Sequence, residues 1–260
     1  MSPRRLGAAA LGALAVTGCG SGANQHAGPG TPREHGQRRP LLPVAPALRV
    51  AATGAVAPLA LRTGSGAQLG ARLRGPVLLR VSPGGQALAL LRSRTEFGSP
   101  RILAVVRRLP GWLGVVSAQR PNNHIGWISA RRAELVGESV RLLVDLSQRR
   151  LTVLRGGREI LRMPVAVGGP ATPTPTGRFE VTDGLYTNGG AYGCCILALS
   201  AHQSHIAQGW TGGDRIAIHG TLDQSSVRRA VSHGCLRAHD ADLRRLLRVA
   251  TLGAEVRIRR

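Results

Sequence analysis

The sequence predicts a mainly β fold, in which a small all-β barrel or sandwich precedes a β-rich domain with short helices. Three observations support this prediction. After about residue 48, short apolar runs recur and turn-forming Gly, Pro, Asn and Ser residues separate them. Clear helical spacing of apolar residues appears near the C-terminus, at 239–247. The 260 residues also suffice for two modest domains after an N-terminal signal and a tether.

The first 19 residues are typical of an export signal. Arg4 and Arg5 supply a positive start, and the apolar run 6–16 is too short for a confident transmembrane helix. The run ends in Val-Thr-Gly-Cys at 16–19, which resembles the lipobox of bacterial lipoproteins. That resemblance implies acylation of Cys19, and the alternative is an ordinary secretory peptide with an incidental cysteine. Residues 20–47 are rich in Gly, Pro, Gln and Arg, which favours a disordered tether.

Residues 48–137 are expected to form a small all-β accessory domain without chemistry of its own. The pattern Ser-Pro-Gly-Gly at 82–85 is a strong turn signal between two apolar runs. The segments around Trp112 and Trp127 resemble bacterial SH3-like domains, and an immunoglobulin-like sandwich is the competing fold. The expected strands are Val77–Val81, Ala87–Leu91, Ile102–Val106, Trp112–Val116 and Gly126–Ile128.

Residues 138–260 are expected to form a second domain that begins as a β-meander. Polar and Gly-rich turns separate its apolar runs. Leu243, Leu246 and Leu247 recur at helical spacing after Asp240, which is a suitable N-cap residue. The expected strands are Val140–Leu146, Leu151–Leu154, Ile160–Val167, Ile196–Leu199 and Ile216–Ile218.

A candidate reactive cluster lies between residues 215 and 237. The strand Ile216–Ile218 is expected to deliver His219 at its end, 225–231 to form one or two helical turns, and 232–234 to form a tight loop before Cys235. A thiol becomes a useful nucleophile when a neighbouring base favours the thiolate. His219 or His233 can supply that base, and Gly234 leaves room for a substrate carbonyl near backbone N–H groups.

Two other interpretations of this cluster stay open on the residues alone. A single cysteine is often a small core residue without chemistry. His219, His233 and Cys235 are also suitable zinc ligands, and His202 and His205 can add to them. Their spacing, however, matches no close-paired cysteine or histidine zinc motif.

Three ordered motifs resemble the L,D-transpeptidase catalytic domain family of the YkuD type. They are Ile218-His219-Gly220-Thr221 with Ser-His-Gly-Cys-Leu-Arg at 232–237, the threonine- and proline-rich segment 165–179, and the closing strand 253–258. The likeness covers about residues 139–260. It implies a β-rich fold with short helices and an active-site cleft at one edge.

The resemblance implies a chemistry that requires no cofactor and no metal. The substrate is a peptidoglycan tetrapeptide stem, His219 is the base, and Cys235 forms a thioester with the stem. A second stem then attacks to make a cross-link, or water attacks as in an L,D-carboxypeptidase. A non-catalytic wall-binding lipoprotein and a zinc peptidase are the remaining alternatives.

The other expected site residues have supporting roles. N–H groups around Gly234 and Cys235 are expected to hold the oxyanion, and the Gly220 carbonyl to orient His219. Ser232 and His233 are expected to shape the loop and hydrogen-bond the substrate. Arg237 is expected to neutralise a substrate carboxylate or brace the cleft, and Tyr192 resembles part of the family's active-site wall.

The formal charge of +22 is due to arginine, since the sequence has no lysine. An exported protein with scattered arginines and few aromatic residues suits anionic wall polymers or lipid headgroups better than nucleic acid. A codon bias toward arginine is the alternative explanation. We expect a protein anchored by lipid to the outer face of the cytoplasmic membrane, facing the wall or periplasm.

The adjacent pair Cys194-Cys195 departs from the usual family pattern. A disulfide between neighbouring residues is strained, and two reduced thiols are the alternative. A third hypothesis is that one of these cysteines oxidises onto Cys235 and silences it.

Overall fold

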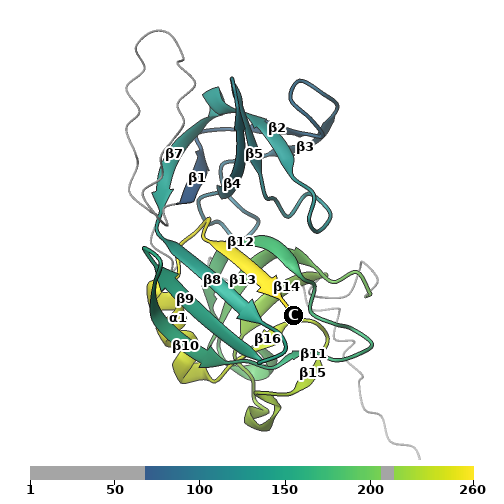
Figure 1. The fold of residues 1–260 in the computed structure, drawn as a ribbon, viewed down its shortest axis with the longest axis vertical. Coiled ribbons are helices and arrows are strands. Elements are labelled where there is room, and N and C mark those ends of the chain that lie inside the picture. The colour runs from purple at the N-terminus through teal and green to yellow at the C-terminus, as the bar shows by residue number, and fades with distance from the viewer. Residues whose placement is uncertain (1–67, 206–213) are drawn as a thin grey trace, which may run out of the picture. The chain divides into compact units, whose positions relative to one another are not determined.

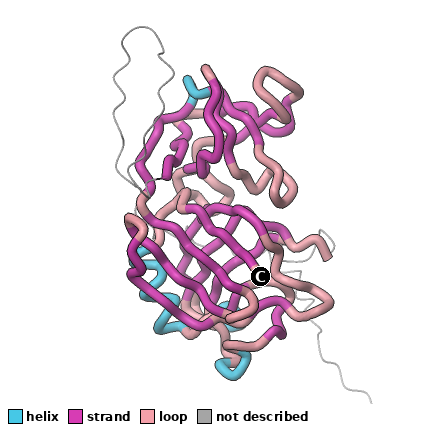
Figure 2. Tube along the Cα trace, viewed as in Figure 1, coloured by secondary structure: helices cyan, strands magenta, loops and turns pink. Residues whose placement is uncertain are grey.

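The computed structural model describes residues 68–205 and 214–260. The predicted signal peptide, Cys19 and the tether lie outside these residues, as does the first part of the expected accessory domain. The prediction of a mainly β fold is confirmed, and Figure 2 shows strands throughout with few helical segments. Within the described ranges, no helix has the length and apolar character needed to span a membrane.

Residues 68–138 contribute a seven-stranded antiparallel sheet with the order β3-β2-β6-β5-β4-β1-β7 (Figure 1). Short connections join two of its neighbouring pairs, β2–β3 and β4–β5. A likeness of this part to SH3-like or immunoglobulin-like domains stays a prediction. Its strands are β1 Gln68–Leu73, β2 Val77–Arg80, β3 Ala87–Leu91, β4 Ile102–Leu109, β5 Trp112–Val115, β6 Gly126–Ser129 and β7 Ala133–Glu138, and η1 Ala130–Arg132 is a short 3-10 helix.

Residues 140–259 contribute an eight-stranded mixed sheet with the order β10-β9-β8-β17-β12-β13-β14-β16, and β11 pairs with β15 separately. The pairs β8–β17 and β14–β16 are parallel. The elements are β8 Val140–Asp145, β9 Arg150–Arg155, β10 Arg158–Pro164, β11 Val167–Gly168, β12 Gly177–Tyr186, η2 Gly190–Tyr192, β13 Cys195–His202, β14 Arg215–His219, η3 Gln224–Ser226, β15 Ala230–Ser232, β16 Leu236–Arg237, α1 Asp240–Val249 and β17 Glu255–Arg259.

Two local expectations were wrong. The segment 225–231 is helical only as part of the 3-10 turn Gln224–Ser226, because Ala230 then pairs with Val167 in the β11–β15 ladder. His239, not Asp240, is the N-cap of α1, and no side chain caps this helix. Asp240 is instead the first helical residue, and its carboxylate lies against the backbone at Gly193 and Gly220.

The main hydrophobic core lies between the eight-stranded sheet and α1. Leu243 and Leu246 are fully buried on one face of α1 and pack in the same cluster as Phe179. Burial of this apolar stripe is the main source of stability for a ten-residue helix, which would be marginal alone. Ile102 and Val136 from the seven-stranded sheet belong to the same cluster, so the core continues from one sheet to the other.

Candidate active site

His219 ends β14, and Cys235 immediately precedes β16, the strand that pairs with β14 in parallel. Ile218 pairs with Leu236, and His219 pairs with Arg237, so Cys235 is opposite Ala217. If the alternation of β16 is extended back by one residue, Cys235 shares the side of His219, away from the face that buries Ile218 and Leu236. Strand spacing of about 4.8 Å and a rise of about 3.3 Å per residue place their Cα atoms about 8 Å apart. The two side chains can therefore meet.

The His219 ring has a fixed tautomer. Its Nδ1 lies 2.6 Å from the Gly220 carbonyl oxygen, which can only accept a hydrogen bond, so Nδ1 carries the proton. Nε2 consequently keeps its lone pair and is available as a base. Burial is the main cause that lowers the pKa of His219, and the charge of Arg237 lowers this pKa further. The hydrogen bond to Gly220 acts in the opposite direction and raises it. The ring is 5% exposed and packs edge-on against Tyr192, with centroids 5.0 Å apart.

Cys235 is the free thiol among the residues that the structure describes, and it is partly buried. Its Sγ lies 4.0 Å from the backbone oxygen of Arg215. Burial raises the pKa of this thiol, against the opposing effects of the Ala217 backbone N–H and the Arg237 charge. The resting pair is therefore a neutral imidazole beside a neutral thiol. Such a pair suits proton transfer during attack rather than a thiolate formed in advance.

The loop before Cys235 is closed by the hydroxyl of Ser232. This oxygen accepts from the Gly234 N–H at 3.1 Å and donates to the Cys235 carbonyl at 2.6 Å. Gly234 has φ +113°, a conformation that residues with a Cβ rarely adopt. Since the Gly234 N–H is already engaged, Cys235 N–H is the better candidate of the two for an oxyanion.

Two buried side chains that the sequence analysis missed hold the same loop. Gln203 is 3% exposed, and its Nε2 donates to the carbonyls of Pro173 at 3.1 Å and His233 at 3.0 Å. Thr174 donates through Oγ1 to the Gly234 carbonyl at 2.8 Å. Thr174 belongs to the threonine- and proline-rich segment that carried the family resemblance, whereas nothing in the sequence pattern distinguishes Gln203.

The remaining predicted site residues surround this pair. Arg237 neighbours His219 in the β14–β16 ladder, and its charge acts on both His219 and Cys235. Tyr192 is 37% exposed beside the His219 ring. His233 is exposed on the loop, and only its backbone oxygen is held. Gly220 is buried and accepts from His219 as expected.

The histidines that were considered as extra zinc ligands have other positions. The ring of His202 contacts the Asp214 carboxylate at 2.9 Å and the Ala118 carbonyl at 2.6 Å. His205 uses its backbone N–H to bond Gln203. Over 68–205 and 214–260, no three or more potential ligand side chains form a group suited to a metal ion.

Cys194 and Cys195 form a disulfide with each other in this structure. The Cys194 Sγ lies 3.6 Å from the Asp240 carbonyl, and the Cys195 carbonyl accepts from the Gly220 N–H at 3.2 Å. Both residues belong to the main core. Of the states considered, the structure has the disulfide, and oxidation of either cysteine onto Cys235 would first require that bond to break.

Comparisons with known proteins agree with the geometry of the C-terminal part. Residues 139–258 match the family model described as YkuD, the L,D-transpeptidase catalytic domain. The chain is 34% identical over 118 residues to the Bacillus licheniformis protein named "Putative L,D-transpeptidase YkuD" and 33% identical over 119 residues to the Bacillus subtilis protein of that name. These alignments cover 45% and 46% of this chain, and 64% and 65% of the two relatives.

Among solved structures, L,D-transpeptidase 3 from Mycobacterium tuberculosis is similar with a TM-score of 0.40 and 15% identity, over 52% of this chain and 73% of that chain. This chain spans slightly less than two thirds of the length of the two curated relatives. The family match itself is confined to the part that holds His219 and Cys235. The match to the family model of the L,D-transpeptidase catalytic domain covers residues 139–258, slightly less than half of this chain.

Proposed function

We propose that this protein is an L,D-transpeptidase that cross-links peptidoglycan through a thioester on Cys235. The observation that supports the proposal is the parallel pairing of β14, which ends at His219, with β16, which follows Cys235 directly, together with the hydrogen bond from His219 Nδ1 to the Gly220 carbonyl. That arrangement leaves one imidazole nitrogen free to accept the thiol proton. The YkuD family match over the same residues gives the reaction class.

The first half of the reaction forms the acyl-enzyme. His219 Nε2 takes the proton of Cys235 as the sulfur attacks the carbonyl carbon of the tetrapeptide stem. The tetrahedral intermediate collapses with cleavage of the bond to the terminal D-amino acid. The imidazolium gives its proton to the departing amine, and the stem remains on Cys235 as a thioester.

The second half transfers the stem to an acceptor. The amine of another stem attacks the thioester, His219 accepts the amine proton, and the thiol of Cys235 is regenerated. If water attacks instead, the net reaction is that of an L,D-carboxypeptidase. Both outcomes use the same residues, so the acceptor decides between them.

The surrounding groups support this chemistry in distinct ways. The Cys235 N–H stabilises the oxyanion, and Arg237 neutralises a carboxylate of the stem. Tyr192 and His233 are exposed beside the pair and form the walls that contact substrate. Ser232 acts indirectly, because its hydroxyl is already committed to fixing the loop.

The proposed substrate requires a location outside the cytoplasm. The N-terminal signal pattern and the lipobox-like Cys19 support export and attachment to the outer face of the cytoplasmic membrane. The tether 20–47 would then let the catalytic domain reach the wall. We therefore propose that the protein acts at the outer face of the cytoplasmic membrane.

Intact-mass analysis tests the proposed function directly. We expect the full chain incubated with a carbapenem, or with a tetrapeptide stem, to gain one covalent adduct. Cys235→Ala should gain none, and His219→Ala should acylate at least about 100-fold more slowly, since a positioned general base contributes about 10²- to 10⁴-fold. His124→Ala is the control, because His124 is exposed on the segment before β6 and outside the cluster.

Two results would overturn the proposal. One is an unmodified wild-type mass while the tetrapeptide is being converted. The other is an adduct that persists in Cys235→Ala.

A further inference from the structure

Three neighbouring strands of the eight-stranded sheet carry arginines on the side that faces away from its core. Arg141 pairs with Glu255 across the β8–β17 ladder, and Arg178 pairs with Arg257 across the β12–β17 ladder. The residues between them, such as Leu142 and Val256, point inward and are fully buried. Alternation along three neighbouring strands therefore gathers arginines on one face.

A groove of about 320 Å³ concentrates this charge, because β4 adds Arg107 and Arg108 to its lining. The carboxylate among the lining residues is Glu255, which is 2% exposed. Its oxygens lie 3.2 Å from Arg141, 3.0 Å from Arg178 and 3.4 Å from Arg257. Five arginines against one glutamate leave an excess of four positive charges in one recess.

We propose that this groove binds a linear polyol phosphate polymer of the cell wall. Guanidinium groups form paired hydrogen bonds with phosphate oxygens, and arginines on four strands can contact successive phosphates of an extended chain. Gln68 supplies an independent feature. Gln68 lines the same groove, and its side-chain oxygen is buried and has no hydrogen-bond partner among the described residues. A polyol hydroxyl is the donor that this oxygen lacks.

The lining of the groove favours this polymer over two other polyanions. Grooves for single-stranded nucleic acid combine basic residues with aromatic side chains that stack on bases, and none of the lining residues is aromatic. A lipid bilayer presents its phosphates as a broad surface, whereas these arginines lie in a recess that a single chain can enter.

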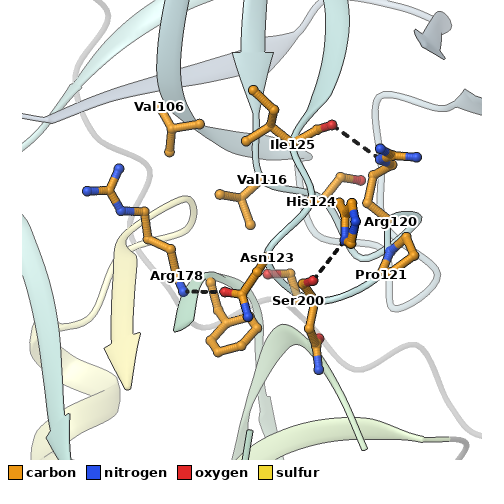
Figure 3. A pocket seen from close by; sticks show the side chains of 12 residues that line it. Val106, Val116, Arg120, Pro121, Asn123, His124, Ile125, Arg178 and Ser200 are labelled. Atoms are coloured by element: carbon orange, nitrogen blue, oxygen red, sulfur yellow. Dashed lines mark hydrogen bonds between the residues drawn. The ribbon is translucent and has the colours of Figure 1, made fainter. Parts of the chain in front are cut away.

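A second, smaller pocket of about 130 Å³ continues the groove, because Val106 and Arg178 line both (Figure 3). Arg120 lines this pocket, and its Nε donates to the Ile125 carbonyl at 3.2 Å. The Asn123 side chain accepts from the Arg178 backbone N–H at 3.4 Å, as the figure shows. Because the pocket adds a sixth arginine, a polymer longer than the groove can extend toward it.

Binding of the polymer does not depend on the proposed transfer reaction. The groove lies on β8, β12 and β17, whereas Cys235 precedes β16 at the edge of the sheet. A polymer held there would keep the catalytic domain at the wall without occupying the reactive pair. Cys235→Ala should therefore bind the polymer like the wild type.

The test uses the full chain and fluorescently labelled poly(glycerol phosphate), with affinity measured by fluorescence anisotropy at several salt concentrations. We expect Arg107→Gln/Arg108→Gln to weaken binding at least tenfold and to flatten the salt dependence. The matched control is Arg131→Gln/Arg132→Gln, which should change affinity less than twofold. These arginines are also adjacent and exposed, and they lie next to β7 of the seven-stranded sheet, to which Arg107 and Arg108 also belong. Gln68→Ala should weaken binding of poly(glycerol phosphate) but not of inorganic polyphosphate, which has no hydroxyl groups along its chain.

Three results would overturn the proposal. The first is an equal loss in the two arginine pairs, which would mean diffuse attraction to the whole basic protein. The second is wild-type binding to phosphatidylglycerol vesicles but not to the soluble polymer. The third is equal affinity for single-stranded DNA and poly(glycerol phosphate) with the same dependence on Arg107 and Arg108.

Discussion

At His219 and Cys235, burial acts in opposite directions on the two pKa values. Loss of water disfavours both charged forms, so it lowers the pKa of the imidazole and raises the pKa of the thiol. Both groups are consequently neutral at pH 7. The Arg237 charge lowers both pKa values, and it therefore favours the thiolate while it disfavours the imidazolium. This arrangement keeps the base ready and the nucleophile protonated until substrate arrives.

The pH dependence of thiol alkylation tests this neutral pair. Because the pKa of Cys235 lies above its ordinary 9.0, less than about 1% of the thiol is ionised at pH 7. We expect the iodoacetamide reaction of the wild type to accelerate continuously from pH 7 to 9. Arg237→Gln removes a charge that lowers this pKa, so it should move the profile to higher pH. A rate plateau below pH 8 would instead indicate a preformed thiolate–imidazolium pair.

On the scale of single elements, the β15–β16 loop depends on a side chain from outside it. Gln203 follows β13, yet its amide group donates to the His233 carbonyl in this loop and to the Pro173 carbonyl in the segment between β11 and β12. Gly234 also packs directly on this amide. The loop that presents Cys235 is thus held by a side chain 30 residues before His233 in the chain.

Gln203→Ala should disturb both stability and reactivity. Two partly buried hydrogen bonds are lost, and each contributes about 0.5–1.5 kcal/mol to the unfolding free energy. The loop should also loosen, and we expect carbapenem acylation to slow about tenfold or more. Urea unfolding and intact-mass kinetics measure the two effects. Gln148→Ala, at an exposed turn position, is the control and should change stability by less than about 0.5 kcal/mol. Unchanged acylation in Gln203→Ala would remove the role assigned to this side chain.

Most strands could be predicted from the sequence because their apolar residues alternate or cluster between turn signals. The expected Ala87–Leu91 agrees with β3 at both ends. The segment 225–231 was predicted incorrectly because its strand character depends on pairing with β11, a partner more than 60 residues away. Local propensity carries no information about such a partner.

The candidate site likewise contains residues that the sequence predicts and residues that it does not. His219 and Cys235 could be proposed because their residue types and ordered motifs indicate chemistry. Gln203 could not, since a polar residue that braces a loop has no local pattern, and its importance follows only from burial and two long-range hydrogen bonds.

On the scale of the whole described structure, polar contacts join the loop between β3 and β4 to the eight-stranded sheet. Thr95 donates to the Asp183 carboxylate at 2.5 Å, and Glu96 accepts from Arg215 at 2.8 Å. Arg215 begins β14, the strand that ends at His219, and its backbone oxygen lies near the Cys235 sulfur. A contact made by the loop between β3 and β4 therefore supports the strand that carries the proposed base.

Glu180 makes this junction sensitive to pH. The side chain is 1% exposed and accepts a hydrogen bond from the Ala104 backbone N–H. Burial raises its pKa from 4.5 to about 8, although Ala104 and the charges of Arg101 and Arg215 oppose the rise. Between these two values the folded protein keeps the proton and the unfolded chain has lost it. The contribution of Glu180 to folding stability is thus fully present below about pH 4.5, and it is lost as the pH rises through about 8.

Glu180→Gln should remove this dependence, because the amide keeps a hydrogen-bond acceptor for Ala104 but cannot ionise. We expect the unfolding free energy of the wild type to fall by a few kcal/mol between pH 5 and 8, following about 1.4 kcal/mol per pH unit for one proton. The variant should show a smaller decline and be the more stable protein at pH 8. Urea unfolding of both proteins at four pH values measures the difference. Parallel stability profiles would show that Glu180 ionises without cost to the fold.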